Sequence, residues 1–509
     1  MEWSRRVAVR ENMNVMDELA RAEEVNAQLR TQRNDRWYPG FHIAAPAGWI
    51  NDPNGISFFG GRYHVFYQHN PYAAHHANMH WGHVSSTDMV TWRHEPIALA
   101  PSLEADLDGV YSGSALEHEG KLYAFYTGHR WFGEEIGSRQ VQYLAISEDG
   151  ITFEKRGVII DTPEGIQDFR DPKVWKMGET WYMVVAAESL ERRGQVWLYT
   201  SQNLTDWEYQ EILFEDPDPG VFMLECPDFF PLGEHWVLLY GPMGTTPTGY
   251  TNRNAHNSGY VVGNWTPGQP FEPLTEYRML DWGHNFYAPQ TFEAPDGRRI
   301  VYAWMGHFVS PIPPQLTDGW SGQLTFPREL TLTPDLRVAS RRIAELAQLR
   351  TETIDVGPLE LGAYEDRVIL PDGDLLEFEL EVDLAHTTAE RFGLRVHATP
   401  DGAHTLVGYD RTGQHVFIDR RLTGNGDRGC RAAPVNDALR LRVLVDRGSV
   451  EVFANDGEEA LSSFSFPNEG KCSVTICSEA GTTAVGTLRI HRLRSIWDRD
   501  DGGASPPEV

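Results

Sequence analysis

The chain has 509 residues, 41% of them hydrophobic and 16 of them tryptophan, and its 44 basic and 73 acidic side chains give a net charge of −29. This length exceeds one ordinary core, so two domains or one large repetitive domain are expected. The acidic excess excludes a polyanionic partner such as nucleic acid, because nothing neutralises its phosphates. The composition indicates a globular protein acting on a neutral or small substrate, and the tryptophans favour carbohydrate, whose C–H faces pack on aromatic rings.

The cysteine count and the amino terminus indicate the compartment. Only Cys226, Cys430, Cys472 and Cys477 occur; their spacing matches no zinc site, and they are too few for a disulfide framework. The first residues lack the apolar core and cleavage site of a signal peptide, and no run approaches the length of a membrane span. We therefore expect a cytoplasmic protein without membrane contact.

Residues 1–37 are predicted to form an N-terminal amphipathic helix and a lead-in to the main body. Between residues 14 and 33, Leu19, Ala22, Val25 and Leu29 recur at helical spacing among charged residues. Such a helix packs either on the main body or on a second subunit. It is therefore one candidate contact for a homo-oligomer.

Residues 38–335 have the sequence pattern of an all-β domain with an internal repeat. Short runs of Val, Tyr, Phe and Trp alternate with Gly, Asn, Asp and Pro turns. A polar triplet precedes an aromatic residue three times, and the aromatic members lie 61 and 54 residues apart, which suits one four-stranded propeller blade. The triplets and their aromatic residues are 86–88 with Trp92, 147–149 with Phe153, and 201–203 with Trp207.

Five polar positions repeat with the same period. Their separations are 60, 59, 54 and 62 residues, so five units account for the region. In a propeller the equivalent position of every blade faces the central axis. We therefore predict a five-bladed propeller in which these residues converge on one funnel. They are Asp52, Ser112, Asp171, Glu225 and Tyr287.

The stretch WINDPNG, residues 49–55, presents the first of these positions. Pro53 moves Asp52 away from helical backbone, Asn54-Gly55 is a tight-turn signal, and residues 56–66 are interpreted as a hairpin. Asp52 is then a carboxylate held where a strand begins. The alternative is an Asx-turn carboxylate that caps its own backbone, and the repeat favours the first interpretation.

The remaining chain is predicted to contain a linker and a second β domain. Residues 336–354 have helical spacing and are interpreted as a linker helix. Residues 355–497 contain seven or more alternating strands, as in a β-sandwich, and this domain is a second candidate contact for a homo-oligomer. Residues 498–509 are rich in Gly, Pro and acidic residues, which is typical of a disordered tail.

Three of the phased positions are carboxylates, which suggests glycosidic bond cleavage. Two carboxyls suffice if one attacks or stabilises the anomeric carbon and the other protonates the leaving oxygen, so they must differ in protonation. Asp52, beside Asn51, is expected to stay ionised. Glu225 has apolar sequence neighbours, which should raise its pKa. Asp171, next to Arg170, should remain an anion. Each alone has a structural alternative, a local ion pair for Asp171 and a satisfied edge carboxylate for Glu225, but the joint phasing favours catalysis.

These motifs resemble glycoside hydrolase family 32, the invertases and β-fructosidases, over residues 38–497. One such motif would be weak evidence, whereas the ordered set is specific. The set comprises 49–55 (WINDPNG), 66–68 (FYQ), 80–83 (HWGH), 111–114 (YSGS), 170–172 (RDP), 225–226 (EC), 303–305 (AWM), 326–330 (FPREL) and 450–453 (VEVF).

The resemblance implies a five-bladed β-propeller followed by a C-terminal β-sandwich. It also implies retaining hydrolysis of terminal non-reducing β-D-fructofuranosides, such as sucrose and short fructo-oligosaccharides, through a covalent fructosyl-enzyme. By motif, Asp52 is the nucleophile, Glu225 the acid/base and Asp171 the transition-state stabiliser. No metal or organic cofactor is implied, and the partner is a small carbohydrate. The substrate-binding residues implied are Asn51, Gln68, His76, Trp81, Ser112, Arg170, Tyr287 and Trp304.

Two departures from the family pattern leave the specificity for the leaving group open. His76 stands where many members carry Trp, and Asn285 replaces the usual Asp, which removes a negative charge expected near the site. A sucrose-6-phosphate hydrolase is an alternative, for which His75, His76, Arg130 and Arg253 are weak phosphate-binding candidates. A fructosyltransferase or fructanase on the same fold is another, and a catalytically silent sugar-binding protein is the alternative of a different class.

Overall fold

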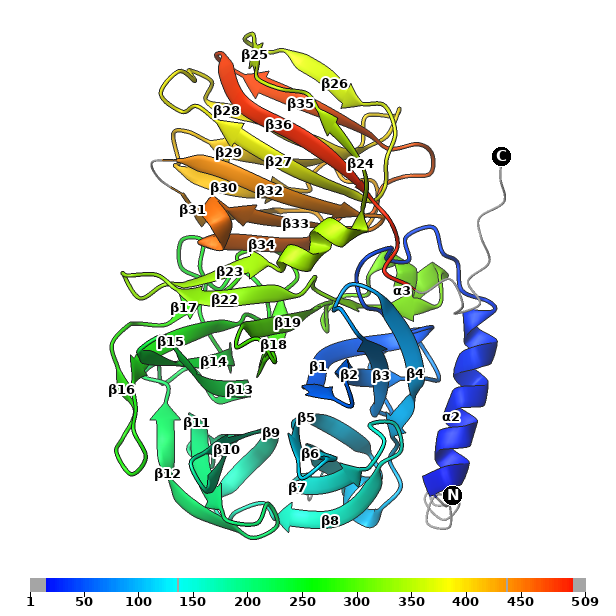
Figure 1. Cartoon of the computed structure of the whole chain (residues 1–509), viewed down its shortest axis with the longest axis vertical. Helices are drawn as coiled ribbons and strands as arrows, with labels where there is room; N and C mark the ends of the chain where they lie inside the picture. The colour runs from blue at the N-terminus through cyan, green and yellow to red at the C-terminus, as the bar shows by residue number, and fades with distance from the viewer. Residues whose placement is uncertain (1–14, 135–136, 436–437, 498–509) are drawn as a thin grey trace.

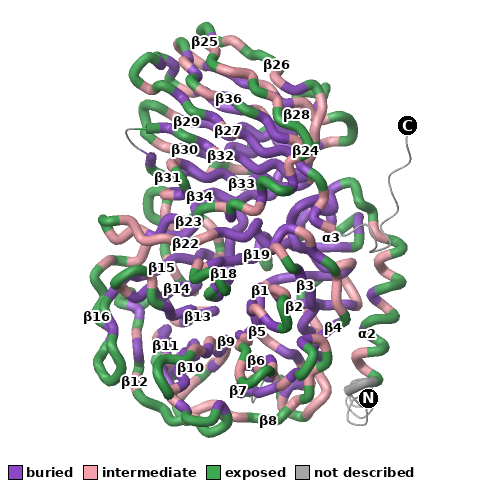
Figure 2. Tube along the Cα trace, viewed as in Figure 1, coloured by how far each residue is buried: buried purple, intermediate pink, exposed green. Residues whose placement is uncertain are grey.

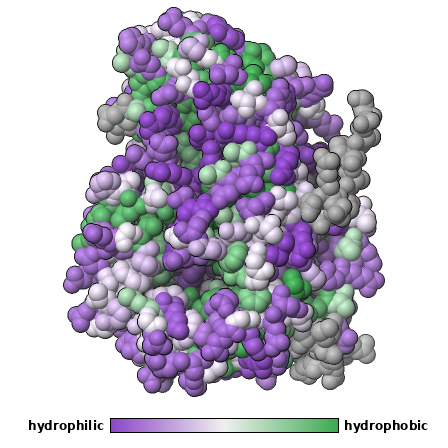
Figure 3. Space-filling view, viewed as in Figure 1, coloured by the Kyte–Doolittle hydropathy of each residue, from purple (hydrophilic) through white to green (hydrophobic). Residues whose placement is uncertain are grey.

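The computed structural model describes residues 15–134, 137–435 and 438–497, so the predicted tail lies outside the described residues. Five sheets between residues 48 and 342 surround a common axis, and a sandwich of two further sheets is stacked against one side of this ring (Figure 1). The surface is hollowed at the centre of the ring (Figure 3). The predicted all-β fold, a propeller followed by a sandwich, is confirmed.

The ring sheets are antiparallel, apart from one short parallel pairing between β20 and β1 that returns the end of the ring to its beginning. The first sheet contains β1 (Gly48–Phe59), β2 (Arg62–Asn70), β3 (His80–Ser86), β4 (Trp92–Leu99) and β20 (Trp320–Ser321). The second contains β5 (Gly109–His118), β6 (Lys121–Trp131), β7 (Ser138–Ser147) and β8 (Glu154–Ile160). The third contains β9 (Ile166–Met177), β10 (Thr180–Ser189), β11 (Gly194–Ser201) and β12 (Trp207–Glu215). The fourth contains β13 (Met223–Leu232), β14 (His235–Met243), β15 (Gly259–Asn264), β16 (Glu272–Pro273) and β17 (Arg278–Met279). The fifth contains β18 (Tyr287–Glu293), β19 (Arg299–Met305), β21 (Gln323–Leu324), β22 (Arg328–Leu332) and β23 (Val338–Arg342).

The repeated polar triplets occupy equivalent turns in the first three sheets. In each, a serine at the end of the third strand accepts backbone N–H groups of the turn, and the aromatic residue lies at or just before the start of the fourth strand. Asp88, Asp149 and Asn203 cap the same turns by accepting further backbone N–H groups. The repeat read from the sequence is therefore a repeat of blade structure.

The five inner strands, β1, β5, β9, β13 and β18, contact one another in sequence, and β18 contacts β1 again. Each loses register with its sheet partner at a comparable point, and such a bulge bends a strand and redirects its side chains. Proline, which has no N–H to pair, follows the bulged residue in four of the five strands. The register shifts lie between Ile50 and Pro53, Val110 and Gly113, Arg170 and Lys173, Glu225 and Asp228, and Tyr287 and Gln290.

The turn expected at Asn54-Gly55 is absent from β1, and that prediction is wrong. Both residues lie inside the strand, and the hairpin turns instead at Gly60-Gly61, where φ is +56° and +76°. Pairing of β1 with β2 through Phe59 outweighs the local preference of Asn-Gly. The Asn54 side chain instead accepts a hydrogen bond of 3.1 Å from the Gly113 N–H of the next inner strand.

The N-terminal helix is present as α2 (Val15–Arg30) and packs on its own chain, beside β3 and β4 (Figure 1). Ala22 of this helix is fully buried. Asn26 donates hydrogen bonds to the backbone oxygens of Ala47 (3.1 Å) and Pro71 (3.2 Å). Of the two partners considered for this helix, the structure shows the main body.

The linker predicted as a helix over residues 336–354 is mostly not α-helical. Its first part is strand β23, which pairs with β22 and completes the fifth ring sheet. A 3-10 helix, η2 (Ala344–Leu349), follows, and the chain then enters β24. The apolar spacing reflects burial of Leu346 and Leu349 in this short turn, while backbone pairing decided the conformation before it.

The sandwich contains two antiparallel sheets around one apolar core, which is buried along its central strands (Figure 2). All seven strands predicted here are present. One sheet contains β24 (Arg350–Asp355), β25 (Leu359–Leu361), β27 (Leu376–Val382), β32 (Leu439–Asp446), β33 (Ser449–Ala454), β34 (Glu459–Phe464) and β36 (Thr483–Leu493). The other contains β26 (Asp366–Leu370), β28 (Arg391–Ala398), β29 (Thr405–Asp410), β30 (His415–Asp419), β31 (Cys430–Pro434) and β35 (Ser473–Glu479). The remaining short elements are η1 (Glu104–Asp106), α3 (Pro313–Thr317) and η3 (Asn455–Gly457).

Candidate active site

A cavity of about 350 Å³ lies where the bulged segments of the inner strands meet. Eight of the residues singled out from the sequence line it: Asn51, Asp52, Gln68, His76, Ser112, Arg170, Asp171 and Glu225. Seven others lining it were not predicted: Tyr111, His129, Gln140, Asp168, Met243, His256 and Phe308.

Asp52 is presented by the bulge of β1, and both of its carboxylate oxygens have partners. Ser112 Oγ donates to Oδ2 at 2.6 Å, and Asn51 Nδ2 donates to Oδ1 at 3.0 Å. Asn51 is itself oriented by the indole N–H of Trp49, 2.7 Å from Asn51 Oδ1. Burial raises the pKa of Asp52, and these hydrogen bonds only partly oppose it. Burial thus disfavours the ionised form while the Asn51 and Ser112 donors favour it, and that Asp52 stays ionised remains a prediction.

Asp171 adopts a left-handed backbone conformation, with φ of +67°, at the bulge of β9. Thr127 Oγ1 accepts its N–H at 2.9 Å, and its own Oδ2 accepts the Cys226 N–H at 2.9 Å. Burial, together with repulsion from Glu225 and Asp52, raises the pKa of Asp171 to about 7, although Arg170 opposes this. The expectation that Arg170 alone would keep it an anion is wrong, because the sequence did not reveal the two neighbouring charges.

Glu225 lies at the bulge of β13 in a polar setting. Arg170 donates to Oε1 at 2.7 Å, and the Tyr287 hydroxyl donates to Oε2. Burial acts to raise the pKa of Glu225, but attraction to Arg170 and the hydrogen bonds outweigh burial and lower it. The predicted rise is wrong because the fully buried Leu224 packs into the third and fourth sheets instead of surrounding the carboxyl.

Arg170 contacts several polar side chains of the cavity. Besides Glu225, it lies 3.6 Å from Asp168 and 4.0 Å from Asp171, and it donates to Gln140 Oε1 at 3.3 Å. Gln140 in turn donates to Asp168 at 2.7 Å. One guanidinium thus serves a group of carboxylates, and this imbalance leaves Asp171 with a raised pKa.

The five phased positions fall into two sets. Glu225 and Tyr287 come before the bulge, in line with Arg170, whereas Asp52, Ser112 and Asp171 lie within it. In β13 and β18 the first residues within the bulge are Cys226 and Ala288, which share the left-handed backbone of Asp171, with φ of +50° and +49°. Cys226 Sγ accordingly lies 3.5 Å from Asp52 Oδ2. A one-residue offset thus gives the site two layers.

Three predicted binding residues do not line the cavity. Trp81 is fully buried among apolar side chains, and its indole N–H donates to the Tyr111 carbonyl at 3.0 Å. Trp304 is 1% exposed and packs behind Trp49, with ring centroids 5.5 Å apart. Tyr287 stands behind the lining residues: its hydroxyl donates to Glu225, and its ring packs against His256 with centroids 5.1 Å apart. These placements correct the expectation that all three would form the wall.

His76 lines the cavity as expected, and an aromatic residue that was not predicted stands next to it. The ring of Phe308 lies 5.4 Å from His76, 5.2 Å from His256 and 4.5 Å from Trp304. Phe308 is 38% exposed, so part of its ring faces solvent. The wall is therefore more aromatic than the presence of His76 suggested.

Asn285 lies away from the cavity, at the contact between ring and sandwich. Its Oδ1 accepts the Phe464 N–H at 3.0 Å and Arg420 at 3.2 Å, and its Nδ2 donates to the Gly306 carbonyl at 3.1 Å. The prediction that this substitution removes a charge near the site is therefore wrong. Its effect falls on the domain contact.

The unpredicted residues differ in how far the sequence could have revealed them. Asp168 precedes Arg170 by two residues on β9, so strand alternation places both on one face. His256 and Phe308 come from connections outside the strands, where no periodicity applies. Among residues 15–134, 137–435 and 438–497, no group of three His, Cys, Asp or Glu side chains is placed to hold a metal ion. Within the same ranges, no helix has the length and apolarity needed to cross a bilayer.

Buried carboxylates of unequal pKa, grouped with hydroxyl- and amide-bearing side chains in a cavity of sugar size, define the class of glycoside hydrolases. Residues 42–341 match the model of the glycosyl hydrolases family 32 N-terminal domain, and residues 343–492 match that of the family 32 C-terminal region. The chain belongs to glycosyl hydrolase family 32. The predicted resemblance and the prediction of a glycoside hydrolase are both confirmed.

Relatives and solved structures agree with this membership. The chain is 40% identical to a sucrose-6-phosphate hydrolase of Escherichia coli, over 91% of this chain and 96% of the relative. It is also 40% identical to a raffinose invertase of Escherichia coli, over 92% and 98%. A GH32 β-fructofuranosidase of Bombyx mori superposes with a TM-score of 0.84 at 31% identity, covering 94% of this chain and 98% of that one. A mutant of the Bombyx mori enzyme has been solved in complex with sucrose.

Proposed function

We propose that the protein hydrolyses terminal non-reducing β-D-fructofuranosides, sucrose and short fructo-oligosaccharides, with retention of configuration. Fructofuranoside hydrolysis follows from its family, and the assignment of roles rests on one observation. Carboxylates from three different inner strands converge around Cys226: its Sγ touches Asp52, its N–H binds Asp171, and Glu225 precedes it in β13. No single strand could supply this constellation.

Asp52 has the geometry of the nucleophile. Ser112 and Asn51 hold one oxygen each, so the carboxylate is kept in one orientation with little conformational freedom to lose. In the first step an Asp52 oxygen forms a bond to C2 of the fructosyl unit. The bond from C2 to the bridging oxygen breaks, and that oxygen takes the proton of Glu225.

Glu225 acts as acid and then as base. Its carboxyl is charged while Arg170 and Tyr287 donate to it. A bound fructosyl unit excludes water and competes for the Arg170 donors, and both changes raise the pKa of Glu225 towards the protonated form. In the second step Glu225 takes a proton from water, whose oxygen attacks C2 and releases Asp52. Fructose leaves, and Glu225 is protonated again.

Asp171 and Arg170 are proposed to hold fructosyl hydroxyls. A hydroxyl donated to Asp171 would also favour the positive charge that develops on the ring. Gln68 and His76 complete the cavity wall, with Gln68 already oriented by a 3.0 Å hydrogen bond to the Val110 carbonyl. Phe308 and His76, at the partly exposed side, are candidates for contact with the leaving sugar.

Replacement of the two central carboxyls tests these roles. Asp52→Asn and Glu225→Gln should each lower kcat on sucrose by at least about a thousandfold. Asp88→Asn is the matched control, since this carboxylate caps a turn in the same sheet and should leave kcat unchanged. A folded Asp52→Asn enzyme that keeps substantial turnover would contradict the nucleophile assignment, and a native chain that releases no reducing sugar from sucrose would favour a silent sugar-binding protein.

Unphosphorylated sugar is proposed as the preferred substrate. Arg170 is the only Lys or Arg among the described residues lining the cavity, and it is already bound to Glu225. Burial lowers the pKa of His76, His129 and His256, so these rings are neutral at pH 7. A phosphate group would therefore meet carboxylates without a free cation.

A substrate panel decides this preference. kcat/KM for sucrose should exceed that for 6-phosphosucrose, and inulin and levan should be poorer than short fructo-oligosaccharides. A higher kcat/KM for 6-phosphosucrose would overturn the preference while leaving the catalytic roles intact. Product analysis at high sucrose concentration separates hydrolysis from fructosyl transfer.

We also propose a cytoplasmic location and leave the homo-oligomer as a hypothesis. All four cysteines are free, which suits a reducing compartment. Gel filtration of the full chain, compared with a form lacking residues 1–36, tests whether the N-terminal helix contributes to self-association. If both forms elute as the same number of chains, the helix contacts only the propeller of its own chain.

A further inference from the structure

The ring holds a second hollow, of about 650 Å³, which is larger than the candidate active site and shares no lining residue with it. Four inner strands, β1, β5, β9 and β13, line both hollows, and β18 lines the second. In β9, Arg170 and Asp171 line the candidate active site, whereas Lys173 to Met177 line the second hollow. In β13, Glu225 lines the first and Asp228 to Pro231 the second. The two hollows are therefore opposite mouths of one axis.

Polar bridges between neighbouring inner strands separate the two mouths. The Gly113 N–H donates to Asn54 Oδ1 at 3.1 Å, and Gln290 Nε2 donates to the Gly113 carbonyl at 3.0 Å. Ser114 Oγ donates to the Pro172 carbonyl at 2.9 Å. A ligand in the second mouth would therefore lie outside the reaction cavity.

Buried polar atoms in the second mouth lack partners. Asp228 and Thr291 are both fully buried. Asp228 Oδ2 accepts the Thr291 N–H at 2.6 Å and lies 3.1 Å from Lys173 Nζ, but Asp228 Oδ1 has no hydrogen-bond partner among the described residues. Thr291 Oγ1 and the indole N–H of Trp175 are also without one. Burying a polar group without a hydrogen-bond partner costs about 1–3 kcal/mol of folding free energy. A ligand that supplies the missing partners would therefore bind favourably to this cluster.

The charges next to Asp228 and Thr291 favour a neutral ligand. Lys173 is paired with Asp228, and Arg299 lies 3.3 Å from Glu293. An anion would face the free oxygen of Asp228, and a cation would face Lys173 and Arg299. A hydroxyl group can donate to Asp228 Oδ1 and accept from Trp175, which satisfies both kinds of unmet group at once.

The walls of the second mouth are aromatic. Phe58, Trp175 and Phe230 line it together with the polar cluster. Rings of this kind pack against the C–H faces of a sugar while its hydroxyls reach polar atoms. We propose that the second mouth is a non-catalytic binding site for a neutral mono- or disaccharide. This inference goes beyond fructofuranoside hydrolysis and is independent of the roles assigned to Asp52 and Glu225.

The test uses the full chain carrying Asp52→Asn, titrated calorimetrically with sucrose and separately with glucose and fructose, which need no hydrolysis. Two sites per chain are expected, and crystals soaked in sucrose should show a sugar ring beside Asp228 and Trp175. One site per chain, with only water in the second mouth, would overturn the proposal. Residual turnover by Asp52→Asn would count against the nucleophile assignment and leave the glucose and fructose titrations valid.

Thr291→Val removes the unmet hydroxyl and keeps the side-chain shape. It should weaken the second site about tenfold while kcat/KM on sucrose stays unchanged in the otherwise native enzyme. Thr423→Val is the matched control, because Thr423 Oγ1 is also buried without a partner but lies in the sandwich. The proposal fails if both variants bind two sugars with native affinity. Tighter binding of glucose 6-phosphate than of glucose at this site would overturn its neutral character.

Discussion

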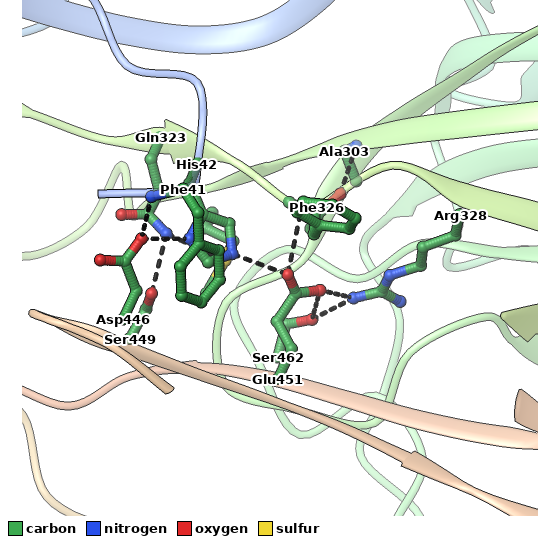
Figure 4. A network of polar contacts seen from close by, with 12 residues as sticks. Phe41, His42, Ala303, Gln323, Phe326, Arg328, Asp446, Ser449, Glu451 and Ser462 are labelled. Carbon is green, nitrogen blue, oxygen red and sulfur yellow. Dashed lines mark hydrogen bonds and ion pairs between the residues drawn. The ribbon is translucent and has the colours of Figure 1, made fainter. Parts of the chain in front are cut away.

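Two clusters of buried carboxylates differ in the number of cations that face them. Between ring and sandwich, Asp446 and Glu451 face His42 and Arg328 (Figure 4), and Asp281 also pairs with Arg328. His42 bridges Asp446 and Glu451 at 2.8 Å each, and Arg328 pairs with Glu451 and, at 2.9 Å, with Asp281. In the candidate active site, Arg170 is the one Lys or Arg among the described lining residues that faces Asp52, Asp171 and Glu225.

The protonation of the two clusters differs accordingly. At the domain contact, burial acts to raise the pKa of Glu451, but Arg328 and His42 outweigh it and lower the pKa to about 2. In the cavity, burial and neighbouring carboxylates raise the pKa of Asp171 to about 7. Burial is similar in both places, so the count of cations decides whether a carboxylate holds its charge. Glu451 at the domain contact therefore stays ionised at neutral pH, whereas Asp171 in the cavity can gain and lose a proton there.

The largest effect is expected at the domain contact. Glu451→Gln should lower the free energy of unfolding by about 3–5 kcal/mol, because Arg328 and His42 are left buried without their carboxylate. Urea unfolding measures the change. Glu148→Gln is the control, since Glu148 pairs with Lys121 at 2.7 Å on the surface, where solvent screens the pair, and its loss should leave the free energy of unfolding almost unchanged. Equal losses in both variants would remove the distinction between buried and exposed pairs.

The second effect concerns pH. Burial acts to lower the pKa of His42, but Asp446 and Glu451 outweigh it and raise the pKa from 6.5 to about 9. The stabilisation from protonated His42 is therefore fully present below pH 6.5 and is lost as pH rises to 9, by about 3 kcal/mol. Unfolding of His42→Gln should depend less on pH across this window than unfolding of the native chain. Parallel pH dependence in the two proteins would contradict the assignment.

The third effect has the opposite sign. The raised pKa of Asp171 means that ionising it costs stability as pH rises from 3.8 towards about 7. Asp171→Asn keeps an oxygen for the Cys226 N–H, so it should lose activity yet gain about 1–3 kcal/mol of stability at pH 8. Asp106→Asn, which removes the buried partner of Lys155, should instead destabilise. If the Asp171→Asn protein is less stable than the native chain, the Asp171 carboxylate stabilises the fold, as the carboxylates at the domain contact do.

The smallest effect is a shift in a pH profile. Tyr287→Phe removes a hydrogen bond that lowers the pKa of Glu225. Since the acid must be protonated, kcat/KM falls as pH rises through the pKa of Glu225. In the variant this fall should occur at a pH higher by up to about one unit. Tyr111→Phe is the control, because Tyr111 lines the cavity and makes no hydrogen bond to Glu225 among those described. An unmoved limb in Tyr287→Phe would exclude Tyr287 as the residue that adjusts Glu225.

Much of the fold was readable from local patterns. Alternating apolar residues predicted a sandwich of seven or more strands, and the recurring polar triplets marked equivalent turns of three ring sheets. Patterns failed where pairing with a distant strand outweighed a local preference. Asn54-Gly55 lies inside β1 because β1 pairs with β2. Residues 338–342 form a strand paired with β22 although their spacing suggested a helix.

The sequence by itself determined which three carboxylates meet in the cavity, because one strand of each blade repeats and brings Asp52, Asp171 and Glu225 to a common axis. Only the tertiary structure decided their protonation and their surroundings. A pKa depends on charges within a few ångströms, and those of Glu225 come from Arg170 and Tyr287, which are 55 and 62 residues away. The same holds for Asn285, whose place at the sandwich instead of the cavity depends on contacts with Arg420 and Phe464 that no local pattern contains.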